Sequence, residues 1–134
     1  MIQNLLNEAR TQWCRLHSGN AAQARLMAEF RLPRHEFSGG SGGGLILRRW
    51  NLEVPAALAP LALRNYKTLI KLQGRFGSSF SLALAGDSIR VSFDGITIDA
   101  VSDGDIAVLE EVFVDELYRF AVPGDAPVVV WDIG

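Results

Sequence analysis

The residues best suited to chemistry in this sequence follow its last apolar run. Residues 128–131 read Val-Val-Val-Trp, and Asp132 and Gly134 come after them. A short, continuous apolar run preceded by Pro127 predicts a central strand of a parallel sheet that is covered on both faces. Open α/β sheets bind nucleotide-like ligands at the carboxyl ends of such strands, where a glycine lets the ligand approach the backbone closely. The pattern therefore predicts a ligand site at Asp132 and Gly134.

The residues before this strand give the prediction a family context. Residues 105–113 read Asp-Ile-Ala-Val-Leu-Glu-Glu-Val-Phe, residues 117–120 read Leu-Tyr-Arg-Phe, and the strand ending in Asp-Ile-Gly follows. In this order, the stretch 87–134 resembles the FkbM family of S-adenosylmethionine-dependent methyltransferases. The resemblance implies that residues 127–134 form the first strand of a Rossmann-like core. It also implies a cofactor site at the following residues, in which the aspartate holds the amino group of the cofactor: Tyr118, Asp132, Ile133 and Gly134.

The same resemblance implies an enzyme that moves a methyl group from S-adenosylmethionine to a hydroxyl of a sugar or another small metabolite. Since the sequence stops at the first glycine of the motif, we expect an N-terminal portion of that enzyme that is not catalytic alone and binds the cofactor weakly or not at all. The apolar strand at 127–132 is expected to promote self-association through unpaired edges. A second interpretation is a complete, non-catalytic binding or assembly module, suggested by the self-contained pattern of residues 79–117.

Composition narrows the class of protein. With 49% hydrophobic and 21% charged residues over 134 positions, the chain is typical of a globular domain. No apolar run approaches the roughly 18 residues of a membrane span, and the N-terminus does not have the pattern of a secretory signal. A single cysteine, Cys14, excludes an internal disulfide. We therefore expect a cytoplasmic protein without a membrane partner.

Charge is distributed unevenly along the chain. Residues 1–75 contain eleven Lys or Arg and four Asp or Glu, whereas residues 76–134 contain two and eleven. We interpret this asymmetry as two halves that face one another or as two solvated surfaces, because no basic run interleaved with aromatic residues indicates nucleic-acid binding. His17 and His35 do not stand in metal-ligand spacing with Cys14, so no metal site is predicted.

The N-terminal part of the chain is predicted to be helical over residues 1–36. A first helix has one apolar stripe at three- and four-residue spacing, formed by Ile2, Leu5, Leu6, Ala9, Trp13 and Leu16. Gly19 ends this helix, and Asn20 with Gln23 predicts a capping box at the start of a second helix, which runs through Phe30. The Gly/Ser-rich residues 37–44 are then expected to be a flexible linker.

Residues 45–126 predict an α+β region that leads into the last strand. Residues 45–50 have the pattern of a strand, and a helix is predicted to begin near Pro60, which is tolerated in a first turn. One face of this helix is basic, and we interpret it as the solvent-exposed face: Arg64, Lys67, Lys71 and Arg75.

Residues 79–101 give the clearest local prediction, a three-stranded antiparallel meander. Apolar and polar residues alternate, and Gly86-Asp87 and Asp94-Gly95 are typical of two-residue hairpin turns. Because such a turn pairs the residues that flank it, the register follows. The predicted pairs are Phe93 with Ile96, Val91 with Ile98, and Leu82 with Val91.

A helix predicted over residues 103–117 should cover the apolar face of this meander. Ser102 and Asp105 predict a capping box at its start. Its apolar stripe is Ile106, Leu109, Val112, Phe113 and Leu117. Its acidic residues are interpreted as solvent-facing rather than as an acid–base pair: Glu110, Glu111, Asp115 and Glu116. The sequence therefore predicts an α+β fold, with N-terminal helices and a small antiparallel meander under a covering helix, leading into the first strand of a truncated Rossmann-like methyltransferase core.

Overall fold

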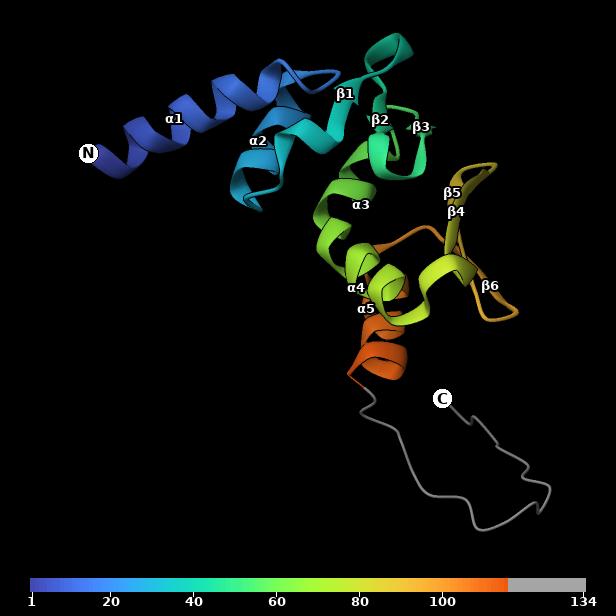
Figure 1. Cartoon of the computed structure of the whole chain (residues 1–134). Helices are drawn as coiled ribbons and strands as arrows, with labels where there is room; N and C mark the ends of the chain where they lie inside the picture. The colour runs from blue at the N-terminus through green and yellow to red at the C-terminus, as the bar shows by residue number, and fades with distance from the viewer. Residues whose placement is uncertain (116–134) are drawn as a thin grey trace, which may run out of the picture.

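The computed structural model describes residues 1–115, which form an α+β unit with two separate antiparallel sheets (Figure 1). The helices are α1 (Ile2–Arg15), α2 (Ala21–Glu29), α3 (Ala59–Arg64), α4 (Tyr66–Phe76) and α5 (Asp103–Leu109). The first sheet has the order β1 (Phe37–Gly39), β2 (Leu45–Leu47), β3 (Leu52–Val54). The second sheet has the order β4 (Ser81–Ala85), β5 (Ser88–Phe93), β6 (Ile96–Ala100). The predicted α+β class is confirmed for this part of the chain.

Helices α1 and α2 form a hairpin at one end of the molecule. The backbone N–H of Gln23 donates to the side chain of Asn20 at 2.9 Å, so Asn20 caps α2 as predicted. The predicted capping box is incomplete, because the side chain of Gln23 accepts from the N–H of Gly19 rather than from that of Asn20. Cys14 and Met27 are buried between the helices. The predicted apolar stripe of α1 does not form this contact. Its large members Ile2, Leu5, Leu6, Trp13 and Leu16 are all exposed.

The flexible linker predicted over residues 37–44 is wrong. Residues 37–39 are strand β1, which pairs with β2, and the side chain of Phe37 is fully buried. The glycines serve close packing of backbones: a Cβ on Gly19 would overlap the carbonyl oxygen of Gly44 and lie 2.5 Å from that of Gly43. The amide of Gln23 locks this contact, since its Nε2 donates to the carbonyl of Gly43 at 2.7 Å and its Oε1 accepts from the N–H of Gly19 at 2.6 Å.

The strand predicted at residues 45–50 is confirmed in its first half. Strand β2 covers Leu45–Leu47, and residues 48–50 form a single 3-10 turn before β3. Leu45 and Leu47 are fully buried together with Val54 of β3. The first sheet therefore packs its apolar face against α3 and α4, which run through the middle of the molecule (Figure 1).

The helix predicted to begin near Pro60 is divided into two. It starts at Ala59, one residue before the proline, and Asn65 separates α3 from α4. The side-chain amide of Asn65 donates to the carbonyl of Leu61 at 2.9 Å, which satisfies an acceptor near the end of α3. The basic side of these helices is exposed, as predicted, while Tyr66 and Leu69 on the other side are fully buried.

The second sheet has the predicted register. Phe93 lies opposite Ile96, Val91 opposite Ile98, and Leu82 opposite Val91. Asp94 and Gly95 both have positive φ, 51° and 81°, as expected for a tight hairpin turn of the type I′ kind. On the polar face of this sheet, Arg90 of β5 is linked to Asp99 of β6: its guanidinium donates to the carboxylate at 2.8 and 3.0 Å.

The helix predicted over 103–117 is shorter than expected. Helix α5 ends at Leu109, and Glu110–Val114 form a single π-helical turn in which the N–H of Asp115 donates to the carbonyl of Glu110 at 2.8 Å. The turn lets the ring of Phe113 meet those of Phe76 and Phe93, at 6.2 and 5.0 Å between centroids. Cover for the meander thus comes jointly from α4, α5 and this turn. None of the helices among residues 1–115 has the length and apolar character needed to span a bilayer.

Candidate functional site

The four residues predicted to bind the cofactor, Tyr118, Asp132, Ile133 and Gly134, lie outside the described residues, as does the strand predicted at 127–132. What the structure describes is the unit that precedes them. Its polar contacts fall into three groups: the start of α5, a network around the buried Tyr66, and an arginine-lined groove between α1 and α2.

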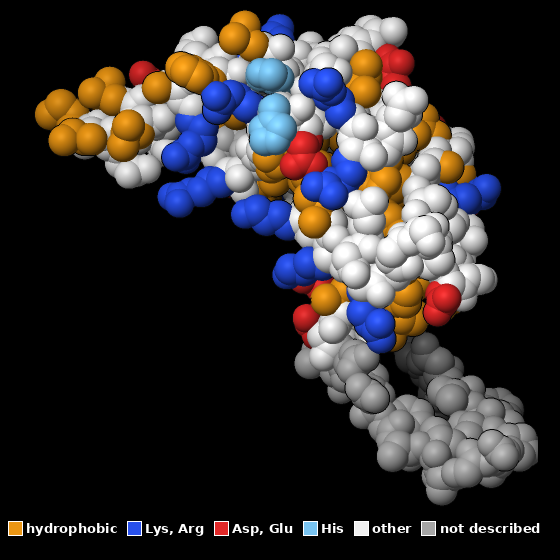
Figure 2. Space-filling view, viewed as in Figure 1, with side chains coloured by type: hydrophobic (Ala, Val, Ile, Leu, Met, Phe, Trp, Pro, Cys, Tyr) orange, Lys and Arg blue, Asp and Glu red, His pale blue; other side chains and the backbone are white. Residues whose placement is uncertain are grey.

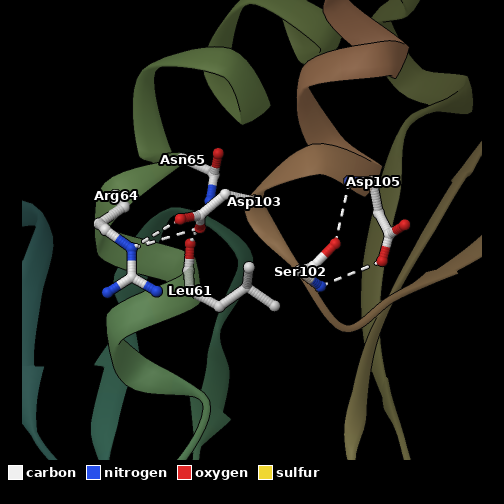
Figure 3. Close-up of polar contacts among 6 residues, drawn as sticks. All are labelled: Leu61, Arg64, Asn65, Ser102, Asp103 and Asp105. Carbon is white, nitrogen blue, oxygen red and sulfur yellow. Dashed lines mark hydrogen bonds and ion pairs between the residues drawn. The ribbon is translucent and has the colours of Figure 1, made fainter.

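The first group fixes the start of α5 (Figure 3). The N–H of Asp105 donates to the hydroxyl oxygen of Ser102 at 3.3 Å, and the carboxylate of Asp105 accepts from the N–H groups of Ser102 and Val101 at 3.0 and 2.9 Å. The predicted capping box is confirmed. The hydrogen bonds from the backbone of Val101 and Ser102 lower the pKa of Asp105 below its ordinary value.

A second carboxylate ties the same helix to α3. Asp103 accepts from Nε of Arg64 at 3.0 and 3.3 Å and from the amide of Asn65 at 2.8 Å (Figure 3). Seven residues later, Glu110 accepts from the hydroxyl of Thr68 at 2.7 Å and from the ammonium of Lys71 at 2.5 Å. The bonds from Lys71 and Thr68 lower the pKa of Glu110.

These contacts correct two expectations about charge. Glu110 was expected to face water, but it is held by α4, and Arg64 and Lys71 of the exposed basic face are each engaged by an acid of α5. The basic and the acidic halves of the sequence therefore do face one another at this junction, one of the two arrangements that the charge asymmetry predicted. Exposed ion pairs contribute little stability each, about 0–1 kcal/mol, so their role here is to set the orientation of α5.

This junction should make the fold sensitive to acid. A carboxyl whose pKa is lowered on folding stabilises the fold above its ordinary pKa, and that contribution is lost as the pH falls through the lowered value. We expect Asp105→Asn to be less stable than the wild type at pH 7, and the difference to shrink at an acid pH below the lowered pKa of Asp105. Urea denaturation at both pH values measures it. Glu111→Gln, an exposed change without a hydrogen bond among the described residues, is the control. A difference independent of pH would contradict the assignment.

The second group is a network around the buried Tyr66, with its outer members Glu36 and Arg49 partly exposed, and the sequence did not predict it. The hydroxyl of Tyr66 donates to Glu36 at 2.8 Å, and Nε of Arg49 donates to the same oxygen at 2.8 Å. Burial and the bond to Glu36 raise the pKa of Tyr66. Although burial alone would raise the pKa of Glu36, the bonds from Tyr66 and Arg49 lower it.

The position of Tyr66 explains this network as structural. Its ring is fully buried and packs against Phe37 and Trp50, at 4.6 and 5.6 Å between centroids. A phenol that stays protonated and bonded to a carboxylate secures the hydroxyl in the core without supplying a base. No motif marked this network in the sequence, because its members come from three segments that only the fold brings together.

The third group is a groove between α1 and α2 with a cavity volume of about 280 Å³. Its lining combines polar side chains of α1, three arginines, one alanine and one acid: Gln3, Asn7, Thr11, Arg10, Arg25, Arg31, Ala28 and Glu29. Arg10, Arg25 and Arg31 have no hydrogen-bond or ion-pair partner among residues 1–115, in contrast to Arg64 and Lys71. The excess of Lys and Arg in residues 1–75 indicated that a basic surface could form, but the sequence did not show which of these residues would lie together.

Metal and thiol chemistry gain no support from the part of the chain that is described. No group of three His, Cys, Asp or Glu residues there could hold a metal ion. Cys14 is a buried core residue, and its burial raises the pKa of the thiol against the opposing charges of Arg34 and Arg10. Comparison with protein-family models, curated proteins and solved structures found no match to the chain.

Proposed function

We propose that this chain belongs to an S-adenosylmethionine-dependent methyltransferase that acts on a hydroxyl of a sugar or another small metabolite. The observation that carries the proposal is the order of elements. A meander of the predicted register and a helix with the predicted capping box come directly before the Leu117–Gly134 stretch that resembles the FkbM family. In this proposal residues 1–115 are a non-catalytic unit in front of the core.

The proposed site lies at the end of the strand predicted at residues 128–131. S-adenosylmethionine supplies an electrophilic methyl group on a positively charged sulfur. The carboxylate of Asp132 accepts hydrogen bonds from the cofactor's ammonium group, and Gly134 leaves room for the cofactor beside the backbone. In this proposal Asp132 and Gly134 line the methionine end of the cofactor, and Tyr118 reaches the mouth of the site.

The described unit has a definite part in this proposal. The start of α5 is fixed to α3 by Asp103 with Arg64 and Asn65, and the turn after α5 is fixed to α4 by Glu110 with Lys71. Together these contacts set the position and direction from which the chain continues toward Tyr118. A site on a rigid scaffold keeps its groups in a productive geometry better than one on a loose segment.

The proposal is tested by calorimetric titration of S-adenosylmethionine into the protein expressed from its whole reading frame. We expect Asp132→Asn to weaken binding by about 10- to 100-fold, because a hydrogen bond between charged groups is lost. Glu111→Gln, which removes an exposed carboxylate from the described unit, should bind as the wild type does. No binding by the wild type, or equal binding by Asp132→Asn, would count against the proposed site.

A second candidate function is the non-catalytic binding or assembly module. The observation that favours it is the apolar side of α1, which is exposed rather than packed against the unit. This reading requires no cofactor. The module function is supported if S-adenosylmethionine does not bind the wild-type protein and the exposed side of α1 is found to bind a partner.

A further inference from the structure

Helix α1 carries most of the exposed apolar surface of the described chain. Nine large hydrophobic residues are exposed, and six of them belong to residues 1–16: Met1, Ile2, Leu5, Leu6, Trp13 and Leu16, with exposed fractions from 54 to 100%. Their spacing places Ile2, Leu5, Leu6, Trp13 and Leu16 on one side of the helix. A continuous apolar surface of this kind marks a contact with a partner or a membrane more often than a single exposed leucine does.

The orientation of α1 explains why this surface stays open. The flank with Gln3, Asn7 and Thr11 lines the groove toward α2, and Cys14 on the same flank is 2% exposed. The apolar side points elsewhere. Because the polar flank of this amphipathic helix packs against its own protein, the apolar face is left available for contact with another molecule.

Arginines also lie beside this apolar face: Arg10 and Arg34 line a pocket with Trp13, and Arg25 lines another with Leu5 and the acidic Glu8. Arg10, Arg25 and Arg31 have no hydrogen-bond or ion-pair partner within residues 1–115, and the guanidinium of Arg34 lies over the ring of Trp13 at 4.6 Å from its centroid. Figure 2 shows hydrophobic side chains gathered along α1 and a row of Lys and Arg side chains along the adjoining edge of the molecule. The face is therefore an apolar strip with a cationic border.

We propose that α1 is a membrane-surface helix that lies in the plane of an anionic lipid bilayer, with its apolar side in the acyl boundary and the arginines at the headgroups. Helices that lie on membranes combine an apolar face that includes Trp and Leu with a cationic border. Trp13 with Arg34 above it suits the interface, where an aromatic ring and a cation meet the headgroups. At 14 residues, α1 is about 21 Å long, long enough for an interfacial contact and too short for a span.

Charge decides between this partner and a second copy of the chain. Two copies joined through α1 would bring the arginine borders near one another, and Glu8 and Glu29 are the only acids on the two helices. An anionic bilayer neutralises the same arginines, and each cation near such a surface adds about 1 kcal/mol, or about fivefold in binding. The sequence analysis expected no membrane partner because no apolar run is long enough to cross a bilayer. That criterion does not apply to a helix that lies in the plane of the membrane surface.

The test is co-sedimentation of the full chain with vesicles of phosphatidylcholine alone and with about 30% phosphatidylserine. We expect binding to the anionic vesicles, little binding to the neutral ones, and loss of binding as salt is raised to about 0.5 M. Leu5→Gln with Leu16→Gln should reduce binding at least tenfold, and Arg25→Gln with Arg31→Gln about twentyfold. All four side chains are exposed, so circular dichroism should show an unchanged fold.

Two matched controls sit elsewhere on the surface. Val101→Gln removes an exposed apolar side chain, and Lys67→Gln an exposed cation of α4. Both should bind vesicles as the wild type does. The proposal is overturned if the wild type ignores anionic vesicles or if the α1 variants bind equally well. It is also overturned if light scattering shows a dimer that Leu5→Gln with Leu16→Gln dissociates while no vesicle binding occurs. Cofactor binding plays no part in these readouts.

Discussion

Replacing Gly19 by alanine should destabilise the N-terminal half of the unit by about 3 kcal/mol or more. The added Cβ would overlap the carbonyl oxygen of Gly44 and lie 2.5 Å from that of Gly43. Both obstacles are backbone atoms, so no side-chain rotation relieves the clash. The two segments would have to separate, and the bonds of Gln23 to Gly19 and Gly43 would lengthen or break.

The same substitution at Gly74 is the matched control, with the opposite sign. Gly74 lies inside α4, and a Cβ there meets no atom within 4 Å. Alanine in a helix interior is favoured over glycine by about 0.5–1 kcal/mol, so Gly74→Ala should be slightly more stable than the wild type. Urea denaturation followed by circular dichroism measures both. Equal stability of Gly19→Ala and the wild type would show that the glycine-rich segment is not packed against the α1–α2 turn.

This prediction marks a limit of the sequence analysis. The segment 37–44 has the composition of a flexible linker, and composition reports what a chain can do locally. The close approach of Gly19 to Gly43 and Gly44 joins positions more than twenty residues apart. The spacing of apolar residues does not predict a contact between segments so far apart. The one hint in the sequence was Gln23, whose side-chain amide can donate to one backbone segment and accept from another.

Local rules worked where both partners of an interaction are close in sequence. The register of β4, β5 and β6 follows from two turns and an alternation, and the capping box at Ser102 and Asp105 spans three residues. The same logic predicted α1 from its apolar spacing but not which way the helix would face. A stripe indicates that a helix has a partner, and only the tertiary structure shows that the partner is not this unit.

The candidate site divides in the same way. Asp132 and Gly134 were assigned from the strand pattern and a resemblance, and Tyr118 and Ile133 from the resemblance alone. All four remain predictions because they lie beyond the described residues. The arginine-lined groove and the Tyr66 network come from segments that are distant in sequence, so they became visible only in the fold. The ion pairs that join α3 and α4 to the α5 segment were predicted only in part. The uneven charge indicated that the two halves could face one another, but it did not indicate through which residues.

Replacing Val91 by aspartate should unfold the second sheet. Val91 is fully buried at the centre of β5, opposite Leu82 on one side and Ile98 on the other. A carboxylate at this position would lose its water without gaining a partner, and an unpaired buried charge costs several kcal/mol. Because a domain of this size is stable by only about 5–15 kcal/mol, the loss is a large part of the total.

A carboxylate on the other face of the same sheet is the control for this last prediction. Ala83 is exposed in β4 and lies opposite Arg90, so Ala83→Asp places its charge in water beside a guanidinium. It should change stability by less than about 1 kcal/mol. Hydrogen exchange of the β4–β6 amides separates the two variants, with protection lost in Val91→Asp and kept in Ala83→Asp. If Val91→Asp kept its protection, the side chain would not be facing the core, and the pairing of Val91 with Leu82 and Ile98 would have to be abandoned.

Since the start of α5 follows directly from β6, loss of the sheet should also release the Ser102 cap. Residues 101–105 should then lose protection together with the strands.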